Sequence, residues 1–220
     1  MSRALGPLRR AVGAYFSYAA THFYDRVTVN RVFPLLGGEL NDLVLRQGRR
    51  AVAAAAGGPI LDMPVGTAYF ASELALAHDG VVIGVDLAEG MVKKAKHVAD
   101  ERGAANLLMA RGDAHRLPFP DDSFSVILCT NGLPVIPGLA DTLAELYRVI
   151  APGGTLFVSA ITLPVGAVLP SPAAARLPAG FRSGRGLLQA LEDAGFNATL
   201  VKQARLAKLF EATKHSGLLS

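Results

Sequence analysis

The sequence predicts an α/β protein built on a mainly parallel sheet with helices on both faces. From about residue 59 onward, short β-rich runs alternate with helical stretches of roughly 10–14 residues, a pattern typical of right-handed βαβ units. Residues 81–86 form a nearly continuous β-branched run, as expected for a strand that is covered on both faces. The last two runs are joined too tightly for a helix to lie between them, so we expect them to pair antiparallel.

Each expected element follows from its own pattern. The predicted strands cover residues 60–63, 81–86, 106–110, 123–129, 155–160, 198–204 and 206–214. The predicted helices cover residues 67–78, 89–102, 139–150 and 186–194. The helix over 139–150 shows an apolar residue at every third or fourth position, and Pro152-Gly-Gly after it is a stop signal.

Length and composition are those of a folded protein of one or two domains. The chain has 220 residues, of which 51% are hydrophobic and 18% charged, so a disordered chain is excluded. Cys129 is the single cysteine, which excludes a disulfide scaffold and fits a reducing compartment. No apolar run reaches the ~18 residues of a membrane-spanning helix. The first residues do not resemble a signal peptide, so we expect a cytoplasmic location.

Two segments lie outside the alternating pattern. Residues 1–58 have helical character and hold aromatic residues at positions 15, 16, 18, 23 and 24. Residues 163–184 hold four prolines, too many for a long helix. Within a single domain overall, we expect 1–58 to form a helical cover segment and 59–214 to form the main ligand-binding unit.

Charge is distributed unevenly along the chain. Residues 1–50 carry 8 Lys/Arg against 3 Asp/Glu, whereas residues 51–150 carry 7 against 12. A basic segment is compatible with an anionic substrate, a membrane surface or nucleic acid, but solvated surface charge explains it more simply. Because the basic residues occur as pairs rather than runs and Trp is absent, we do not expect nucleic-acid binding.

Polar and glycine residues follow three of the predicted strands, where open parallel sheets bind their ligands. Asp62 and Gly66 follow the first strand, Asp86 ends the second, and Asp113 follows the third. A carboxylate in the position of Asp86 is suited to both hydroxyls of a ribose, and one in the position of Asp113 to an adenine amino group. The alternatives are a plain strand-to-helix turn for the first loop and helix caps for Asp86 and Asp113. The first loop contains neither Gly-x-Gly-x-x-Gly nor Gly-Lys-Ser/Thr, which counts against a pyrophosphate cradle and a P-loop.

Five stretches carry a family resemblance. They are Ile60-Leu-Asp-Met-Pro-Val-Gly-Thr-Ala, Gly84-Val-Asp-Leu-Ala-Glu-Gly-Met-Val, Arg111-Gly-Asp-Ala-His-Arg-Leu-Pro-Phe-Pro-Asp-Asp-Ser-Phe, Leu143-Ala-Glu-Leu-Tyr-Arg-Val-Ile-Ala-Pro-Gly-Gly-Thr-Leu and Leu187-Leu-Gln-Ala-Leu-Glu-Asp-Ala-Gly-Phe. In this order they resemble the class I S-adenosylmethionine (SAM)-dependent methyltransferases, in the group of the ubiquinone- and menaquinone-biosynthesis enzymes (methyltransferase type 11). The third stretch is the most specific. The resemblance implies a Rossmann-like, seven-stranded, mostly parallel sheet of order 3-2-1-4-5-7-6 with strand 7 antiparallel.

The resemblance also implies a SAM site at the ends of the first four strands. Its cofactor-binding positions are Asp62, Pro64, Gly66, Thr67, Asp86, Leu87, Met91, Gly112, Asp113, Ala114 and Asn131. By the resemblance, the loop after the first strand lines the methionine end of the cofactor. The loops after the second and third strands hold the ribose and the adenine, and Asn131 lies near the reactive sulfonium. The family usually has Gly-Cys-Gly-Thr-Gly in the first loop, where this chain has Pro64-Val-Gly-Thr-Ala68, and we expect this departure to affect affinity for the cofactor.

We therefore expect an enzyme that transfers a methyl group from SAM, leaving S-adenosylhomocysteine, to oxygen or carbon of a small hydrophobic acceptor. Aromatic, quinone-like and polyketide compounds are the candidate acceptors. Two alternatives stay open: a SAM-binding protein of the same fold that catalyses another reaction such as cyclisation, and a nonenzymatic SAM-binding partner subunit. The candidates for a catalytic base are His22, Tyr24, Asp25 and His115, each with a structural role as its alternative. No metal site is expected.

Overall fold

The computed structural model of the chain describes residues 10, 11, 13–15, 31, 35, 39–162 and 183–216. The predicted catalytic candidates His22, Tyr24 and Asp25 therefore lie outside the described residues. The same holds for residues 163–182, which include the four prolines of the second atypical segment.

A seven-stranded sheet runs through the described residues in the order β3-β2-β1-β4-β5-β7-β6. Its strands are β1 (Ile60–Asp62), β2 (Val82–Asp86), β3 (Leu107–Arg111), β4 (Phe124–Thr130), β5 (Ile150–Ile161), β6 (Asn197–Ala204) and β7 (Ala207–Thr213). Neighbours from β3 to β5 pair in parallel, whereas β7 pairs antiparallel with both β5 and β6. The predicted order and the antiparallel seventh strand are confirmed.

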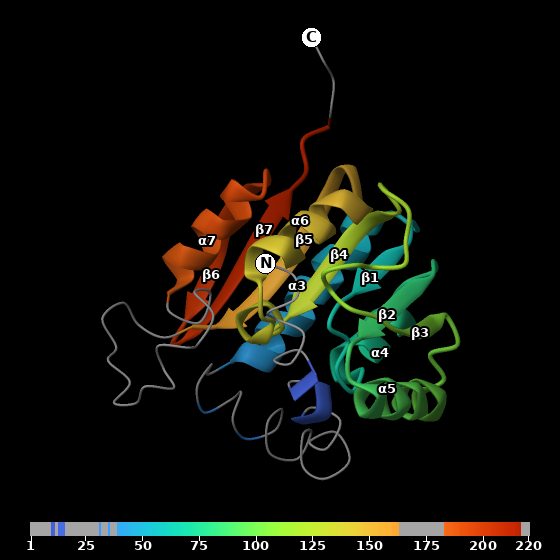
Figure 1. Cartoon of the computed structure of the whole chain (residues 1–220). Coiled ribbons are helices and arrows are strands. Elements are labelled where there is room, and N and C mark those ends of the chain that lie inside the picture. The colour runs from blue at the N-terminus through green and yellow to red at the C-terminus, as the bar shows by residue number, and fades with distance from the viewer. Residues whose placement is uncertain are drawn as a thin grey trace.

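Helices cover both faces of this sheet (Figure 1). They are α3 (Leu40–Ala55), α4 (Tyr69–Leu76), α5 (Glu89–Arg102), α6 (Leu139–Val149) and α7 (Gly184–Asp193), with a short 3-10 turn, η3 (Leu133–Val135), between β4 and α6. Apolar side chains of α3, α4 and α5 pack with strand residues in one core cluster, and those of α6 and α7 pack with the opposite face in another. Burial on both faces explains why β2 and β4 consist almost wholly of apolar residues.

Helix α4 begins later than predicted, at Tyr69 rather than at residue 67. The cause is the backbone of the preceding loop, in which Gly66 and Ala68 both have positive φ, 57° and 60°. A right-handed helix excludes such values, so it can begin only after Ala68. The first strand is also shorter than predicted, since β1 ends at Asp62.

Strand β5 begins earlier than predicted, at Ile150 rather than at residue 155. The predicted stop signal Pro152-Gly-Gly therefore ends α6 but lies inside the next strand. The strand accommodates it by a shift in its register with β4. The N–H of Gly153 donates to the carbonyl of Lys214 (2.9 Å), and the carbonyl of Gly154 accepts from the N–H of Lys214 (3.0 Å), so the extra residues remain paired.

Helix α3 belongs to the layer that covers the sheet. Its buried residues recur with helical spacing and are Leu40, Leu43, Val44, Gln47, Gly48, Ala51 and Ala55. The Nε2 group of Gln47 donates hydrogen bonds to the carbonyl of Val158 on β5 (3.3 Å) and to that of Phe210 on β7 (3.1 Å). These two bonds fix the position of α3 on the sheet. The boundary at residue 58 between a cover segment and a main unit stays a prediction.

Candidate functional site

The carboxyl ends of four strands bring polar residues to one edge of the sheet. Asp62 ends β1, Asp86 ends β2, Asn131 follows β4, and Ser159 lies near the end of β5. Because the parallel strands β2, β1, β4 and β5 are neighbours, their ends lie side by side. The sequence predicted the first three positions and missed Ser159.

Asp86 holds the loop that follows β1. Its Oδ2 accepts a hydrogen bond from the N–H of Gly66 (3.0 Å), and its Oδ1 accepts one from the N–H of Ala88 (2.8 Å). The residue is only 8% exposed, and this burial raises its pKa to about 6 against the opposing effect of the backbone hydrogen bonds. Ala88 is the N-cap residue of α5, and this cap has no side-chain hydrogen bond, so Asp86 holds the chain just before the helix and does not cap it. A carboxylate accepts about four hydrogen bonds, so Asp86 also keeps capacity for a ligand.

The backbone of the loop after β1 has a conformation that allows a ligand to approach it closely. Gly66 has φ +57°, and a Cβ added there would meet no atom within 4 Å, so the space in front of it is open. Ala68 adopts a similar left-handed conformation (φ 60°, ψ 23°). A side chain in this region costs about 1 kcal/mol, which explains why the resembling family uses glycine at this position. Thr67, between the two, is buried.

Asp62 is the most deeply buried carboxylate of the site. It is 4% exposed, and its Oδ1 has no hydrogen-bond partner in the described part of the chain. Burial, and after it the negative charge of Asp86, raises the pKa of Asp62 from 3.8 to about 8. The carboxyl group therefore carries a proton at neutral pH unless a cation faces it.

Asn131 lies where the loop after β4 meets the loop after β1. Its N–H donates to the carbonyl of Ser159 (2.8 Å), whereas its side-chain Nδ2 and Oδ1 and the Oγ of Ser159 have no partner among the described residues. A Cβ added to the neighbouring Gly132 would overlap the ring of Pro64, so the two loops are in direct contact. With Asp62, these atoms leave a buried set of unused donors and acceptors, which favours a polar ligand at this edge.

His115, one of the four predicted catalytic candidates, is enclosed by polar partners. Its Nδ1 lies 2.6 Å from Oδ1 of Asp113 and its Nε2 lies 2.6 Å from the carbonyl oxygen of Pro137. Its side chain is 7% exposed. This geometry ties the loop after β3 to the start of α6. The capping alternative for Asp113 is not met, because residues 112–123 contain no helix.

Three further predicted cofactor positions surround the ends of β2 and β3. The N–H of Gly112 donates to the carbonyl of Asp86 (3.0 Å), which holds the two strand ends together. Met91 is buried on the inner side of α5. Ala114 is partly buried and packs against the core on the α6 side of the sheet. These residues shape the edge rather than offer polar groups to it.

Leu87 is the predicted cofactor position that meets the N-terminal segment. A Cβ built on Gly13 would stand 3.6 Å from Cγ of Leu87, so Gly13 lies close to this side chain. The described part of residues 1–58 therefore reaches the ribose end of the predicted site. Tyr15, two residues further along the chain, is exposed.

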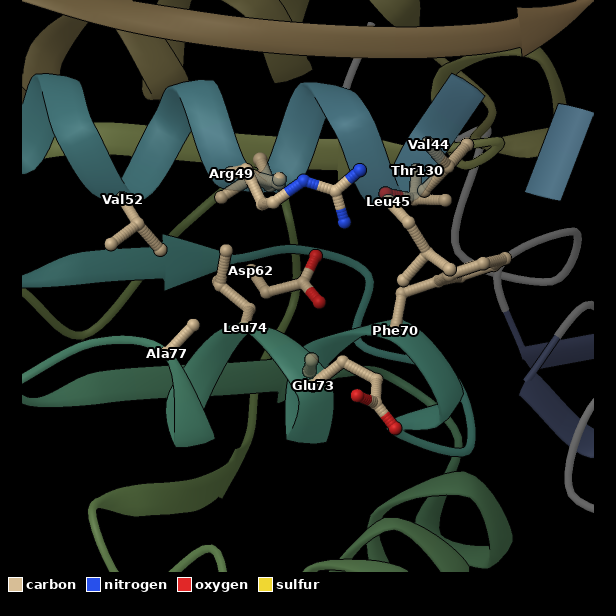
Figure 2. A pocket seen from close by; sticks show the side chains of 13 residues that line it. Val44, Leu45, Arg49, Val52, Asp62, Phe70, Glu73, Leu74, Ala77 and Thr130 are labelled. Carbon is tan, nitrogen blue, oxygen red and sulfur yellow. The ribbon is translucent and has the colours of Figure 1, made fainter. Parts of the chain in front are cut away.

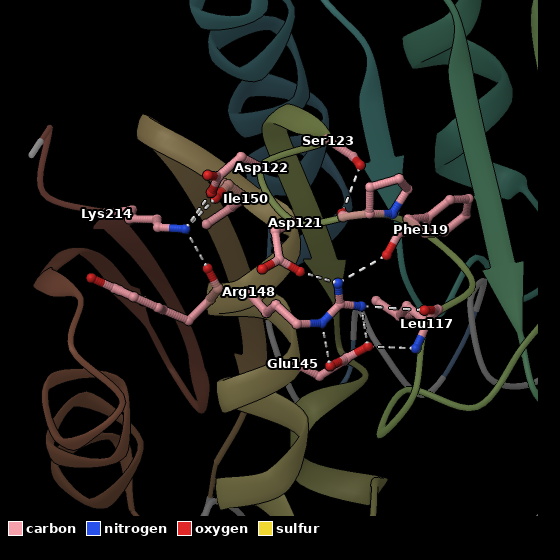
Figure 3. Close-up of polar contacts among 11 residues, drawn as sticks. Leu117, Phe119, Asp121, Asp122, Ser123, Glu145, Arg148, Ile150 and Lys214 are labelled. Carbon is pink, nitrogen blue, oxygen red and sulfur yellow. Dashed lines mark hydrogen bonds and ion pairs between the residues drawn. The ribbon is translucent and has the colours of Figure 1, made fainter.

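The most specific stretch of the resemblance has a structural role that sequence analysis did not assign (Figure 3). Arg148 on α6 donates to both carboxylate oxygens of Glu145 (2.6 and 2.9 Å), to the carbonyls of Leu117 (3.3 Å) and Phe119 (2.9 Å), and to Asp121 (2.7 Å). Glu145 also accepts from the N–H of Leu117 (2.7 Å). The hydrogen bonds from Arg148 lower the pKa of Glu145. This network anchors the chain that follows Asp113 to α6. In the sequence, the third and fourth stretches of the resemblance contain these residues and could have indicated that the two segments interact.

A cavity of about 200 Å³ opens between α3 and α4 (Figure 2). Its lining residues are Val44, Leu45, Gly48, Arg49, Val52, Asp62, Phe70, Ala71, Glu73, Leu74, Ala77, Leu128 and Thr130. Asp62 from β1 points into it between the two helices, and the guanidinium of Arg49 extends toward it from α3 (Figure 2). Neither this cavity nor a role for Arg49 is predicted by the sequence, in which Arg49 is indistinguishable from a solvated surface charge.

Residues 39–162 and 183–216, with the few described before them, contain no group of three His, Cys, Asp or Glu side chains that could hold a metal ion. None of the helices in the described part is long and apolar enough to cross a membrane.

Residues 60–154, which contain all of this edge, match the family described as "Methyltransferase domain". A stretch of 96 residues is 40% identical to a demethylmenaquinone methyltransferase of Geobacillus kaustophilus. Residues 60–154 are therefore similar to a methyltransferase domain. The alignment with the Geobacillus relative covers 43% of this chain and 41% of the relative, so it spans less than half the length of that protein.

Solved structures show that the methyltransferase fold extends beyond residues 60–154. A SAM-dependent methyltransferase from Aquifex aeolicus is similar with a TM-score of 0.66 at 20% identity, over 83% of this chain and 93% of that one. The [4+2]-cyclase SpnF is similar with a TM-score of 0.66 at 20% identity, over 79% of this chain and 82% of that one. The fold is thus shared by proteins named as methyltransferases and by one named as a cyclase.

Proposed function

We propose that the chain is an enzyme that uses SAM to methylate oxygen or carbon of a small hydrophobic acceptor. The observation that carries the proposal is the set of unpartnered buried polar atoms on Asp62 and Asn131, beside the loop held by Asp86, within a methyltransferase domain. SAM presents an amino-acid end, a ribose and an adenine in that order. Asp62 ends β1, Asp86 ends β2 and Asp113 follows β3, and these strands are consecutive in the sheet, so the proposed contacts have the same order.

Each proposed contact uses a different feature of the site. Asp86 would accept from the ribose hydroxyls with the lone pairs that its two backbone hydrogen bonds leave over. Gly66 would allow close approach, because nothing stands in front of it. Asp113, held by His115, would face the adenine amino group. Asn131 would lie nearest to the reacting sulfur.

The contribution of the chain to catalysis is orientation and exclusion of water. When bound, SAM supplies a methyl group on a positively charged sulfur, which an acceptor displaces in line. The residues of this edge hold one reactant in a fixed position, and fixing both reactants supplies a large part of the barrier reduction. We assign His115 to positioning the loop of Asp113, because both of its ring nitrogens already lie against oxygen atoms of the protein.

Two observations support a small hydrophobic acceptor. The Geobacillus relative is named for methylation of demethylmenaquinone, a quinone-type compound. Gly13 lies close to Leu87 of the predicted cofactor site, and the sequence that follows it holds five aromatic residues between positions 15 and 24, a composition that suits an apolar acceptor. Quinones and phenols are therefore the first acceptors to test.

Calorimetric titration with S-adenosylhomocysteine tests cofactor binding. We expect one site per chain in the parent and about 10- to 100-fold weaker binding for Asp86→Ala, because charge-assisted hydrogen bonds to the ribose are lost. Asp100→Ala, which removes an exposed carboxylate of α5, is the matched control and should bind like the parent. Equal affinity of Asp86→Ala and the parent would contradict the ribose assignment, and saturation by NAD instead would contradict the proposal as a whole.

Cyclisation is the second candidate function, favoured by the similarity to SpnF over 79% of this chain. The two functions can be distinguished by where the tritium of labelled SAM ends up and by whether the mass of the acceptor changes. Methyl transfer moves tritium from labelled SAM to an acceptor from a panel of quinones, phenols and polyketides. Cyclisation gives an isomer of the acceptor with unchanged mass and leaves the label on SAM.

A further inference from the structure

Lys208 on β7 is a half-buried lysine without a counter-ion among the described residues. Its Nζ donates a hydrogen bond to Oγ1 of Thr162 (2.7 Å), and in the part of the chain that the structure describes it makes no ion pair. An ammonium group has three donor positions, so two of them stay available. Burial without a compensating charge lowers the pKa of Lys208. The proposed cofactor contacts leave this group unused.

The described elements around Lys208 offer it no acidic partner. Its cross-strand neighbours are Ala160 on β5 and Gln203 on β6. Glu211, the acidic residue of β7, lies 2.9 Å from Arg50 of α3 and is paired there. Helix α7, which lies beside β6 and β7 in Figure 1, has no acidic residue in its first turn. The positive charge is therefore left uncompensated by these groups, which favours an anionic group from a ligand.

Lys208 lies at the same edge of the sheet as the proposed cofactor site, because β7 runs antiparallel to β5. It is the second residue of β7, and its Nζ reaches Thr162, which directly follows β5. Asn131, which we place nearest to the reacting sulfur, follows the neighbouring strand β4 and donates to the carbonyl of Ser159. Two strand spacings, about 10 Å, thus separate β7 from β4. A lysine side chain and a small aromatic molecule together span this distance.

The position of the ammonium is fixed from two sides. A Cβ added to Gly184, the first residue of α7, would overlap Cδ and Cε of Lys208, so the methylene chain runs directly against this glycine. At the other end of the side chain, Thr162 accepts the hydrogen bond from Nζ. A charge that is already held in place binds a ligand without an additional cost for ordering it.

A single ammonium is suited to a single anionic oxygen. Carboxylates are matched best by the planar guanidinium of arginine, which binds both of their oxygens, whereas an ammonium is a compact point charge. The proposed acceptor is small and hydrophobic, and among such compounds a phenol presents one oxygen that can ionise. Lys208 therefore favours a phenolic hydroxyl over a carboxylate.

We propose that Lys208 binds the hydroxyl group of a phenolic acceptor and holds its oxygen in the ionised form for methyl transfer. The inference rests on the proposed function, and it names both the reacting group of the acceptor and a residue that contacts it. The hydroxyl proton is released to solvent when the acceptor binds. The ionised oxygen then forms a bond to the methyl carbon, while the bond from that carbon to sulfur breaks and its electron pair stays on the sulfur.

The test measures the ionisation of 4-nitrophenol, whose anion absorbs visible light, on protein saturated with S-adenosylhomocysteine. The proteins are the parent, Lys208→Met and the control Lys202→Met, at an exposed position of β6. In the parent and the control, the ionisation midpoint of the bound probe should fall by about 1–2 pH units, the usual effect of a nearby opposite charge. In Lys208→Met it should not fall. Gly184→Ala keeps every charge but displaces the side chain of Lys208, so most of the shift should be lost.

Calorimetry with S-adenosylhomocysteine alone separates the possible failures and shows that each variant is folded. If the parent binds this ligand but leaves the midpoint of the probe unchanged, the role of Lys208 is wrong while the proposed cofactor stands. The same conclusion follows if Lys208→Met or Gly184→Ala shifts the midpoint as far as the parent does. If the parent does not bind S-adenosylhomocysteine, the proposed function is wrong and this inference with it. Tighter binding of 4-nitrobenzoate than of 4-nitrophenol would indicate a carboxylate site and would overturn the choice of a phenol.

Discussion

Replacing Asp62 with asparagine should flatten the pH dependence of stability of the ligand-free protein. Asparagine has nearly the same shape and does not ionise. In the parent, burial raises the pKa of Asp62 from 3.8 to about 8. Since the folded pKa lies above the unfolded one, the stability that the protonated group provides is complete below about pH 4. It is lost progressively as the pH rises toward 8.

The size of the effect follows from this window. Between pH 5 and pH 7 the unfolded chain ionises Asp62 while the folded chain keeps it protonated, and each pH unit costs the folded state ~1.4 kcal/mol. The parent therefore loses about 3 kcal/mol from this residue over the two units. Both pH values lie well inside the window, so the result does not depend on the upper pKa. Other groups, including Asp86, titrate in parent and variant alike and cancel in the comparison.

Urea unfolding at pH 5 and at pH 7 measures the difference. The free energy of unfolding of the parent should fall by about 3 kcal/mol more than that of Asp62→Asn over this interval. Asp100→Asn, at an exposed position of α5, should follow the parent. Parallel behaviour of the parent and Asp62→Asn would refute the argument that Asp62 is buried without a compensating partner.

Two further substitutions test the scaffold around the site. Arg148→Ala should lower the free energy of unfolding by about 2 kcal/mol, because Glu145 and two loop carbonyls lose their donor. Urea unfolding beside Lys96→Ala, at an exposed position, checks this, and equal stability of the two variants would argue against the network. Gly132→Ala should cost about 1–3 kcal/mol and weaken binding of S-adenosylhomocysteine, because its Cβ would overlap Pro64 and push the loops apart. An unchanged melting temperature in Gly132→Ala would contradict the direct contact of these loops.

The sheet and its polar edge could be predicted because they depend on short-range patterns. Alternating runs place strands and helices, and polar residues directly after strands, such as Asp62 and Asp86, must reach the same edge of a parallel sheet. The order of the strands came from the resemblance and not from the alternation. The start of α4 was missed because the left-handed backbone of Ala68 leaves no trace in a residue that normally favours helices.

The charged part of the site could not be read from the sequence. Arg49 and Arg50 are adjacent in the chain and look alike as solvated charges, yet one lines a cavity and the other pairs with Glu211 on β7. Only the packing of α3 against α4 separates their roles. Arg148 presents the same limit, since its five acceptors include backbone carbonyls far away in sequence, whose positions depend on the finished fold.

The attachment of α3 through Gln47 has a consequence for how the site could change over evolution. The side chain of Gln47 donates hydrogen bonds to the backbone of both β5 and β7. A shift of α3 along the sheet would therefore break two buried hydrogen bonds at once. Arg49 stands two residues further along the same helix, while Asp62 is fixed at the end of β1. The position of α3 relative to the end of β1 therefore depends on backbone carbonyls of the sheet, which side-chain substitutions in β5 and β7 do not remove. The width of the cavity between α3 and β1 should therefore stay constant while the side chains that line it are exchanged.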